Sequence, residues 1–167
     1  MSSSRPIRLL MTADAVGGVW SYAVDLLRGL APHGVESTLA VLGPAPTADQ
    51  RAAAAAVPGL RLLETALPLE WLADSRAEIT ASGQALAELA REVGADLVHL
   101  NTPAPAACAA FPVPLVIACH SCVATWWDAV RGGPLPDDFR WRAEPPLPAG
   151  TLLPDERSLA MLGEHPA

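Results

Sequence analysis

Residues 7–30, IRLLMTADAVGGVWSYAVDLLRGL, constrain the fold of this chain more than any other stretch. They open with a short apolar run, which is typical of a parallel strand covered on both faces. After Gly17 and Gly18 the apolar residues change to helical spacing: Val19, Ala23, Leu26, Leu27 and Leu30. A strand that enters a helix through a glycine turn is the first half of a βαβ unit. Ligands bind at this edge of open α/β sheets, and the start of a helix favours an anion.

The rest of the chain continues this alternation. The first strand is expected to end near Thr12, with the first helix over residues 19–31. Further strands are expected at residues 37–42, 60–64, 96–100 and 114–119, and further helices at 47–57 and 75–93, with a short helical turn within 104–110. Strands and helices in this order predict an α/β fold, a Rossmann-like parallel sheet flanked by helices. Residues 1–142 are expected to form this domain, and residues 143–167 a Pro-rich tail.

Composition excludes several other classes of protein. The chain has 167 residues, of which 51% are apolar and 17% charged, so it is expected to be globular. Its net charge of −7 and the lack of a basic stripe argue against nucleic acid as a partner. No window approaches about 18 uninterrupted apolar residues, so no membrane span is expected. Three cysteines and no export signal predict a cytoplasmic protein with free thiols.

Polar residues follow several of the predicted strands. Because parallel strands end at one edge of a sheet, Asn101 and Thr102, His120 and Ser121, and residues 14–18 should meet there. His120 could bond a sugar hydroxyl or act as a general base, or it could simply be satisfied by backbone at the strand end. His99, inside the fourth strand, is interpreted as structural.

The glycine turn has two interpretations. Gly17 and Gly18 match neither the G-x-G-x-x-G spacing nor a Walker loop, which needs a following Lys and Ser or Thr. They could therefore serve a ligand, or they could only form a turn that needs a positive φ.

A CxxC pair invites a redox or zinc interpretation. It consists of Cys119 and Cys122, and Cys108 stands alone, so a second ligand pair at zinc spacing is missing. The simpler interpretation is two free thiols with Cys119 buried, and no metal site is expected.

Aromatic and basic residues concentrate after the fifth strand. Exposed tryptophan rings often pack on sugar faces, so one of Trp126 and Trp127 is expected at a cleft and the other in the core. The alternative is that both pack a helix against the sheet edge. Arg131, Arg140 and Arg142 could contact an anionic ligand, or they could be solvated surface.

Three segments together carry a resemblance to a known family. TADAVGGVWSYAVDLLRGLAPHGVESTLAVLG resembles the opening of family 4 glycosyltransferases, which are retaining enzymes of the GT-B fold. ADLVHLNTPAPAA and PVPLVIACHSCVATWWDAVRGGPLPDDFRWR resemble the fourth strand of the family and the segment from its fifth strand to a histidine. The resemblance covers residues 6–142, the amino-terminal, acceptor-side domain, and HSCxxTWW is similar to a bacterial subgroup.

The resemblance implies a function and a set of site residues. Such enzymes transfer a sugar from a nucleotide-sugar donor to the hydroxyl of a glycan or small-molecule acceptor, without a cofactor and usually without a metal. His120 matches the histidine that contacts the transferred sugar and is the expected catalytic residue. The expected substrate-binding residues are Gly17 and Gly18 in the matching loop, Asn101, Thr102 and Ser121 on the rim, and Trp126 and Trp127. Peripheral contact with a membrane stays open.

One departure from the family leaves the status as an enzyme open. The family's second domain binds the nucleotide and carries a basic residue and E-x7-E carboxylates, which these 167 residues do not contain. Residues 143–167 fit the family poorly, as a truncation or a frameshift near Glu144 would produce. The expectation is a truncated amino-terminal domain that is inactive alone. The alternative is a non-enzymatic Rossmann-like module that binds a carbohydrate or a partner protein.

Overall fold

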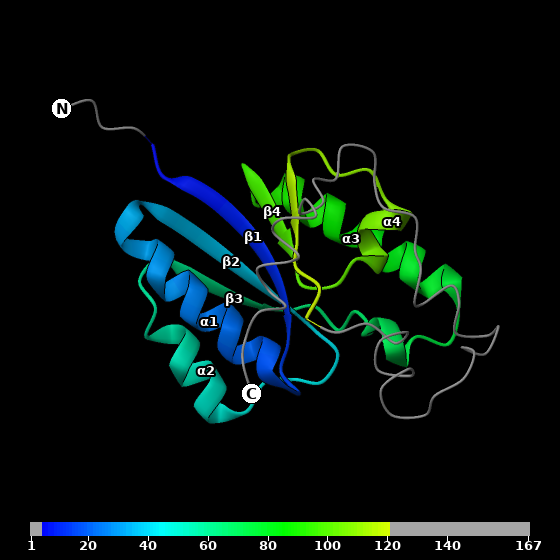
Figure 1. Cartoon of the computed structure of the whole chain (residues 1–167), viewed down its shortest axis with the longest axis horizontal. Coiled ribbons are helices and arrows are strands. Elements are labelled where there is room, and N and C mark those ends of the chain that lie inside the picture. Colours follow the sequence, from blue (N-terminus) through cyan, green and yellow to red (C-terminus); the bar gives the residue numbers. More distant parts are fainter. Residues whose placement is uncertain (1–4, 121–167) are drawn as a thin grey trace, which may run out of the picture.

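The computed structural model describes residues 5–120 (Figure 1). Its strands are β1 (Ile7–Asp14), β2 (Val35–Leu42), β3 (Leu60–Glu64), β4 (Leu97–Leu100) and β5 (Leu115–Ile117). Its helices are α1 (Gly18–Leu30), α2 (Ala48–Ala55), α3 (Arg76–Glu92) and α4 (Ala104–Cys108), with 3₁₀ turns η1 (Ala31–His33) and η2 (Glu70–Leu72). The predictions about Ser121, Cys122, Trp126, Trp127, the three arginines that follow them and the tail lie outside the described residues.

The strands form one parallel sheet in the order β3-β2-β1-β4-β5. The chain first builds outward from β1 to β3 and then crosses back to place β4 on the other side of β1. The boundary between β1 and β4 is therefore the switch point of the sheet, where α/β proteins bind ligands at the carboxyl ends of the strands. The predicted fold class, a Rossmann-like parallel sheet flanked by helices, is confirmed.

Helices cover both faces of the sheet, which makes three layers (Figure 1). On one face, α1 and the α2 region pack against alternate side chains of β1 and β2, and Trp20 and Leu27 are buried there. On the other face, α3 and α4 pack against β4 and the opposite side of β1, around Leu10, Leu86 and Leu100. Burial on both faces explains why the strands read as continuous apolar runs.

Local signals explain where the helices begin and end. Thr47, the N-cap of α2, accepts a hydrogen bond from the Gln50 amide, and the Gln50 side chain accepts from the Thr47 amide in return. Ser75 caps α3 by accepting from the Glu78 amide. Gly94 follows α3 with a φ of +61°, which suits glycine. Among residues 5–120, no helix is long and apolar enough to cross a membrane.

Several predicted strand boundaries differ from the observed ones. β2 begins at Val35 rather than at residue 37, because its ladder with β1 starts at the pairing of Ile7 with Val35. β1 continues past Thr12 to Asp14, because its parallel ladder with β2 extends as far as the pairing of Asp14 with Leu42. β5 is shorter than residues 114–119, because its ladder with β4 ends at Ile117. The longer β1 matters for the site, since it carries Asp14 to the edge of the sheet.

Candidate functional site

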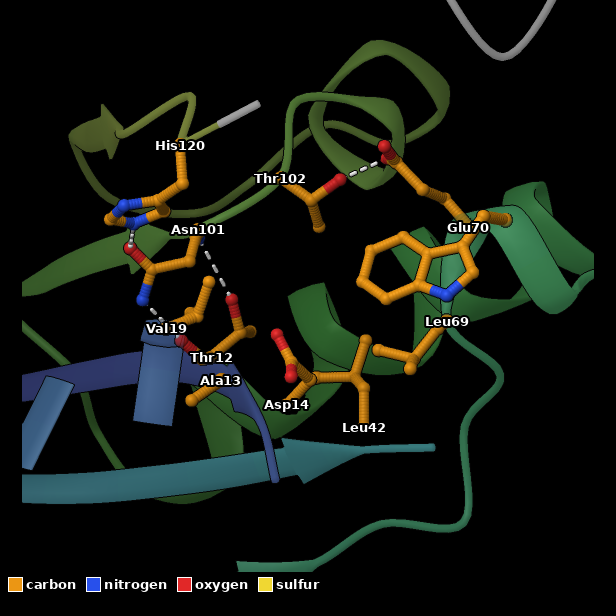
Figure 2. A pocket seen from close by; sticks show the side chains of 11 residues that line it. Thr12, Ala13, Asp14, Val19, Leu42, Leu69, Glu70, Asn101, Thr102 and His120 are labelled. Atoms are coloured by element: carbon orange, nitrogen blue, oxygen red, sulfur yellow. Dashed lines mark hydrogen bonds between the residues drawn. The ribbon is translucent and has the colours of Figure 1, made fainter. Parts of the chain in front are cut away.

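A pocket lies at the carboxyl ends of β1 and β4, at the switch point of the sheet (Figure 2). Segments that are far apart in sequence meet there: the end of β1, the start of α1, η2, and the residues after β4 and β5. The lining residues are Thr12, Ala13, Asp14, Val19, Leu42, Leu69, Glu70, Trp71, Asn101, Thr102 and His120. The prediction that residues after the first, fourth and fifth strands share one edge is therefore confirmed for Asp14, Asn101, Thr102 and His120.

His120 is held by Asn101, and Asn101 is held by Thr12. The Nε2 atom of His120 lies 2.8 Å from Oδ1 of Asn101. The side-chain amide of Asn101 donates to the Thr12 carbonyl at 2.6 Å, and its backbone amide donates to the Thr12 hydroxyl at 3.1 Å. The β1–β4 ladder ends at the pairing of Met11 with His99. The hydrogen bonds between Asn101 and Thr12 continue the contact between the two strands just beyond that pair. Figure 2 shows the chain of contacts from β1 to His120.

A second histidine and a tyrosine lie behind this contact. Tyr22 of α1 meets His120 edge to face, with ring centroids 4.5 Å apart, and His99 at 6.1 Å. His99 is 7% exposed, and burial, then the nearby His120, lower its pKa against the opposing effect of a hydrogen bond with Asn101. Its Nε2 is buried and has no hydrogen-bond partner among the described residues. Burial and a neighbouring histidine both disfavour the charged form of an imidazole, so His99 favours its neutral form.

Asp14 closes the loop between β1 and α1. Its Oδ1 accepts from the amides of Val16 at 2.9 Å and Gly17 at 3.0 Å, which lie just before the first turn of the helix. Gly17 is the N-cap of α1 with a φ of −137°, and Gly18 is not among the residues with positive φ. The interpretation of this loop as a positive-φ turn is therefore wrong.

The two glycines lie beside the pocket rather than in its lining. A Cβ atom added to Gly17 or Gly18 would have no neighbour within 4 Å among the described atoms. Packing in this part of the chain therefore does not require glycine at either position, while the bare backbone lies open to the outside.

The opposite wall of the pocket comes from η2. Glu70 is only 8% exposed, and the Thr102 hydroxyl donates to its Oε2 (Figure 2). Trp71 is 46% exposed and lines the pocket. Sequence reasoning missed Glu70 and Tyr22. A signal existed for Tyr22, which follows Val19 at helical spacing, whereas nothing local marked Glu70.

The cysteine prediction needs one correction. Cys119 is exposed, so the interpretation of this thiol as buried is wrong. It follows β5, two residues after that strand ends at Ile117. Among residues 5–120, no group of three His, Cys, Asp or Glu side chains could hold a metal ion.

Comparisons with known proteins identify the family. Residues 16–148 match the family model described as Glycosyltransferase Family 4. The fold is similar to the crystal structure of a glycosyltransferase from Rickettsia africae ESF-5, with a TM-score of 0.54 and 14% identity, over 76% of this chain and 35% of that chain. No match was found among curated proteins. The family match spans most of the sequence, and the chain therefore belongs to glycosyltransferase family 4.

Proposed function

We propose that this chain serves the transfer of a sugar from a nucleotide-sugar donor to an acceptor hydroxyl, with retention. In this proposal residues 1–142 are the amino-terminal, acceptor-side domain of a GT-B enzyme. The observation that carries the proposal is His120, held by a hydrogen bond at the switch point of the sheet in a chain of this family. The crystal structure with a similar fold belongs to a longer chain, of which this chain covers 35%.

The polar groups of the pocket suit hydroxyl recognition. His120 can accept a hydrogen bond from a sugar hydroxyl or take its proton, and Asp14 and Glu70 can accept from neighbouring hydroxyls. The indole of Trp71 offers an apolar face at the rim. Gly17 and Gly18 leave the backbone bare at the start of α1, so a ligand could approach it closely. Ser121, Trp126 and Trp127 remain proposed acceptor contacts.

The charge of the pocket bears on the donor. Its described lining carries two carboxylates and no arginine. A leaving nucleoside diphosphate needs positive charge or well-placed donors where its own charge develops. We therefore propose that a second domain stabilises the diphosphate, and that the 167-residue chain alone binds sugar without transferring it. We also propose that the protein acts in the cytoplasm and without a metal.

The experiment measures turnover and binding separately. The purified 167-residue chain is mixed with UDP-glucose or GDP-mannose, and the release of nucleoside diphosphate is followed. No release above the rate in buffer is expected, and clear turnover would refute the need for a second domain.

Binding is then tested by titrating methyl glycosides and the same nucleotide sugars while following tryptophan fluorescence. A saturable change that is lost in both Trp71→Phe and His120→Ala supports the proposed site. Binding that survives both substitutions, or no response to any of these sugars, contradicts it. A saturable response to methyl glycosides but to no nucleotide sugar would instead favour a carbohydrate-binding module.

A further inference from the structure

The orientation of the Asn101 side chain follows from its contact with Thr12. A backbone carbonyl can only accept a hydrogen bond, so the group 2.6 Å from the Thr12 carbonyl must be the Asn101 NH₂. The Asn101 Oδ1 then faces His120. The backbone of β1 thus settles an assignment that an isolated amide would leave open.

The proton on His120 follows in turn. Oδ1 of an amide has no hydrogen to give, so Nε2 of His120, 2.8 Å away, must be the donor. A neutral imidazole carries one proton, which leaves Nδ1 as its accepting nitrogen. No other hydrogen bond to His120 occurs within the described residues, so Nδ1 is the ring nitrogen left for a ligand.

The hydrogen bond to Asn101 opposes the alternative orientation of the ring. Tyr22 packs edge to face against the His120 ring and makes a longer contact with His99. Turning the ring by 180° would bring a carbon to Asn101 Oδ1 and lose the hydrogen bond, whose acceptor is partly buried. His99 lies behind the pair, where burial lowers its pKa.

We infer that Asn101 is a positioning residue for His120, and that it holds the proton on Nε2 so that Nδ1 is the atom that accepts from a ligand hydroxyl. The inference deepens the proposed function and rests on it for the role of His120, but not for the state of the ring. It changes the expected role of Asn101, whose side chain interacts with Thr12, His120 and the neighbouring His99 rather than with substrate.

The test reads the ring directly. The full chain is labelled with ¹⁵N-histidine, and long-range ¹H–¹⁵N spectra are recorded at a pH of about 8.5, where an unperturbed imidazole is neutral. The wild type should show His120 with its proton on Nε2 alone, whereas exposed His33 should show the tautomer mixture of a free imidazole. In Asn101→Ala, His120 should move to the mixture of His33. Thr102→Ala, which alters the neighbouring residue, should leave His120 unchanged.

A second variant guards against misfolding of the first. Asn101→Asp keeps an oxygen that can accept from Nε2, so His120 should keep its proton on Nε2, whereas Asn101→Ala should lose this preference.

The inference is wrong if wild-type His120 shows the mixture of His33, or if Asn101→Ala keeps the preference for Nε2 or Asn101→Asp loses it. Neither measurement needs a substrate. A failure of sugar binding with the tautomer result intact would refute the proposed function alone.

Discussion

Gly83 offers the sharpest stability prediction, because two physical effects oppose each other there. It lies buried in α3, where α4 crosses it. A Cβ added at this position would lie 2.5 Å from the carbonyl oxygen of Pro105 and 3.2 Å from the Cβ of Ala109. Replacing glycine by alanine in a helix normally stabilises by about 1 kcal/mol. The clash involves backbone that cannot rotate away, and overpacking of this kind costs about 1–3 kcal/mol.

We expect the clash to dominate, with Gly83→Ala destabilising the domain by about 1–2 kcal/mol. Gly29→Ala is the matched control, since Gly29 is in α1, is exposed, and has no atom within 4 Å of an added Cβ. It should stabilise by up to about 1 kcal/mol. Urea denaturation followed by circular dichroism should rank Gly29→Ala above the wild type and Gly83→Ala below it. A Gly83→Ala protein at least as stable as the wild type, with Gly29→Ala behaving as expected, would refute the close packing of α3 on α4.

Further predictions concern single side chains, each measured by urea denaturation. Leu86→Ala should cost about 3–4 kcal/mol, because Leu86 is fully buried under the sheet. Thr47→Ala should cost about 1 kcal/mol through loss of the α2 cap. The lowered pKa of His99 predicts stability that is full above pH about 6.5 and falls as the pH drops through the folded pKa; His99→Gln should remove this dependence. Arg5 holds the pKa of Asp96 at about 2, so this contribution is full above pH about 4 and lost toward pH 2; Asp96→Asn should abolish that acid loss.

The sequence was most informative about elements and edges. Five short apolar runs, each followed by a polar or glycine-containing turn, predicted five strands, and parallel pairing predicted that Asp14, Asn101 and His120 would share an edge. Both predictions follow from local patterns, because a run of neighbouring apolar residues indicates a strand that is buried on two faces. The order of the strands is not local. That β4 lies beside β1 is decided by which apolar surfaces meet once the helices pack.

The contacts within the site were harder to predict for the same reason. Glu70 and Thr102 are 32 residues apart, and no periodicity links them. The helix start was expected to favour an anionic ligand, which stays a prediction; the sequence did not indicate that the loop before it closes onto Asp14 of the same chain. Gly17 was linked to a positive φ because glycine permits it, whereas the loop closes through the hydrogen bonds to Asp14 instead.

The most direct test of the central claim is a map of where sugars bind. Backbone amide shifts of the ¹⁵N-labelled 167-residue chain are recorded during titration with UDP-glucose, GDP-mannose, methyl glucoside and methyl mannoside. The titrations are made with the wild type and with His120→Ala. We predict that at least one of these ligands shifts amides around the ends of β1 and β4, centred on Asp14, Asn101 and His120, and that these shifts are lost in His120→Ala. Shifts centred on another surface, or unchanged in His120→Ala, would contradict the assignment of this pocket to sugar transfer.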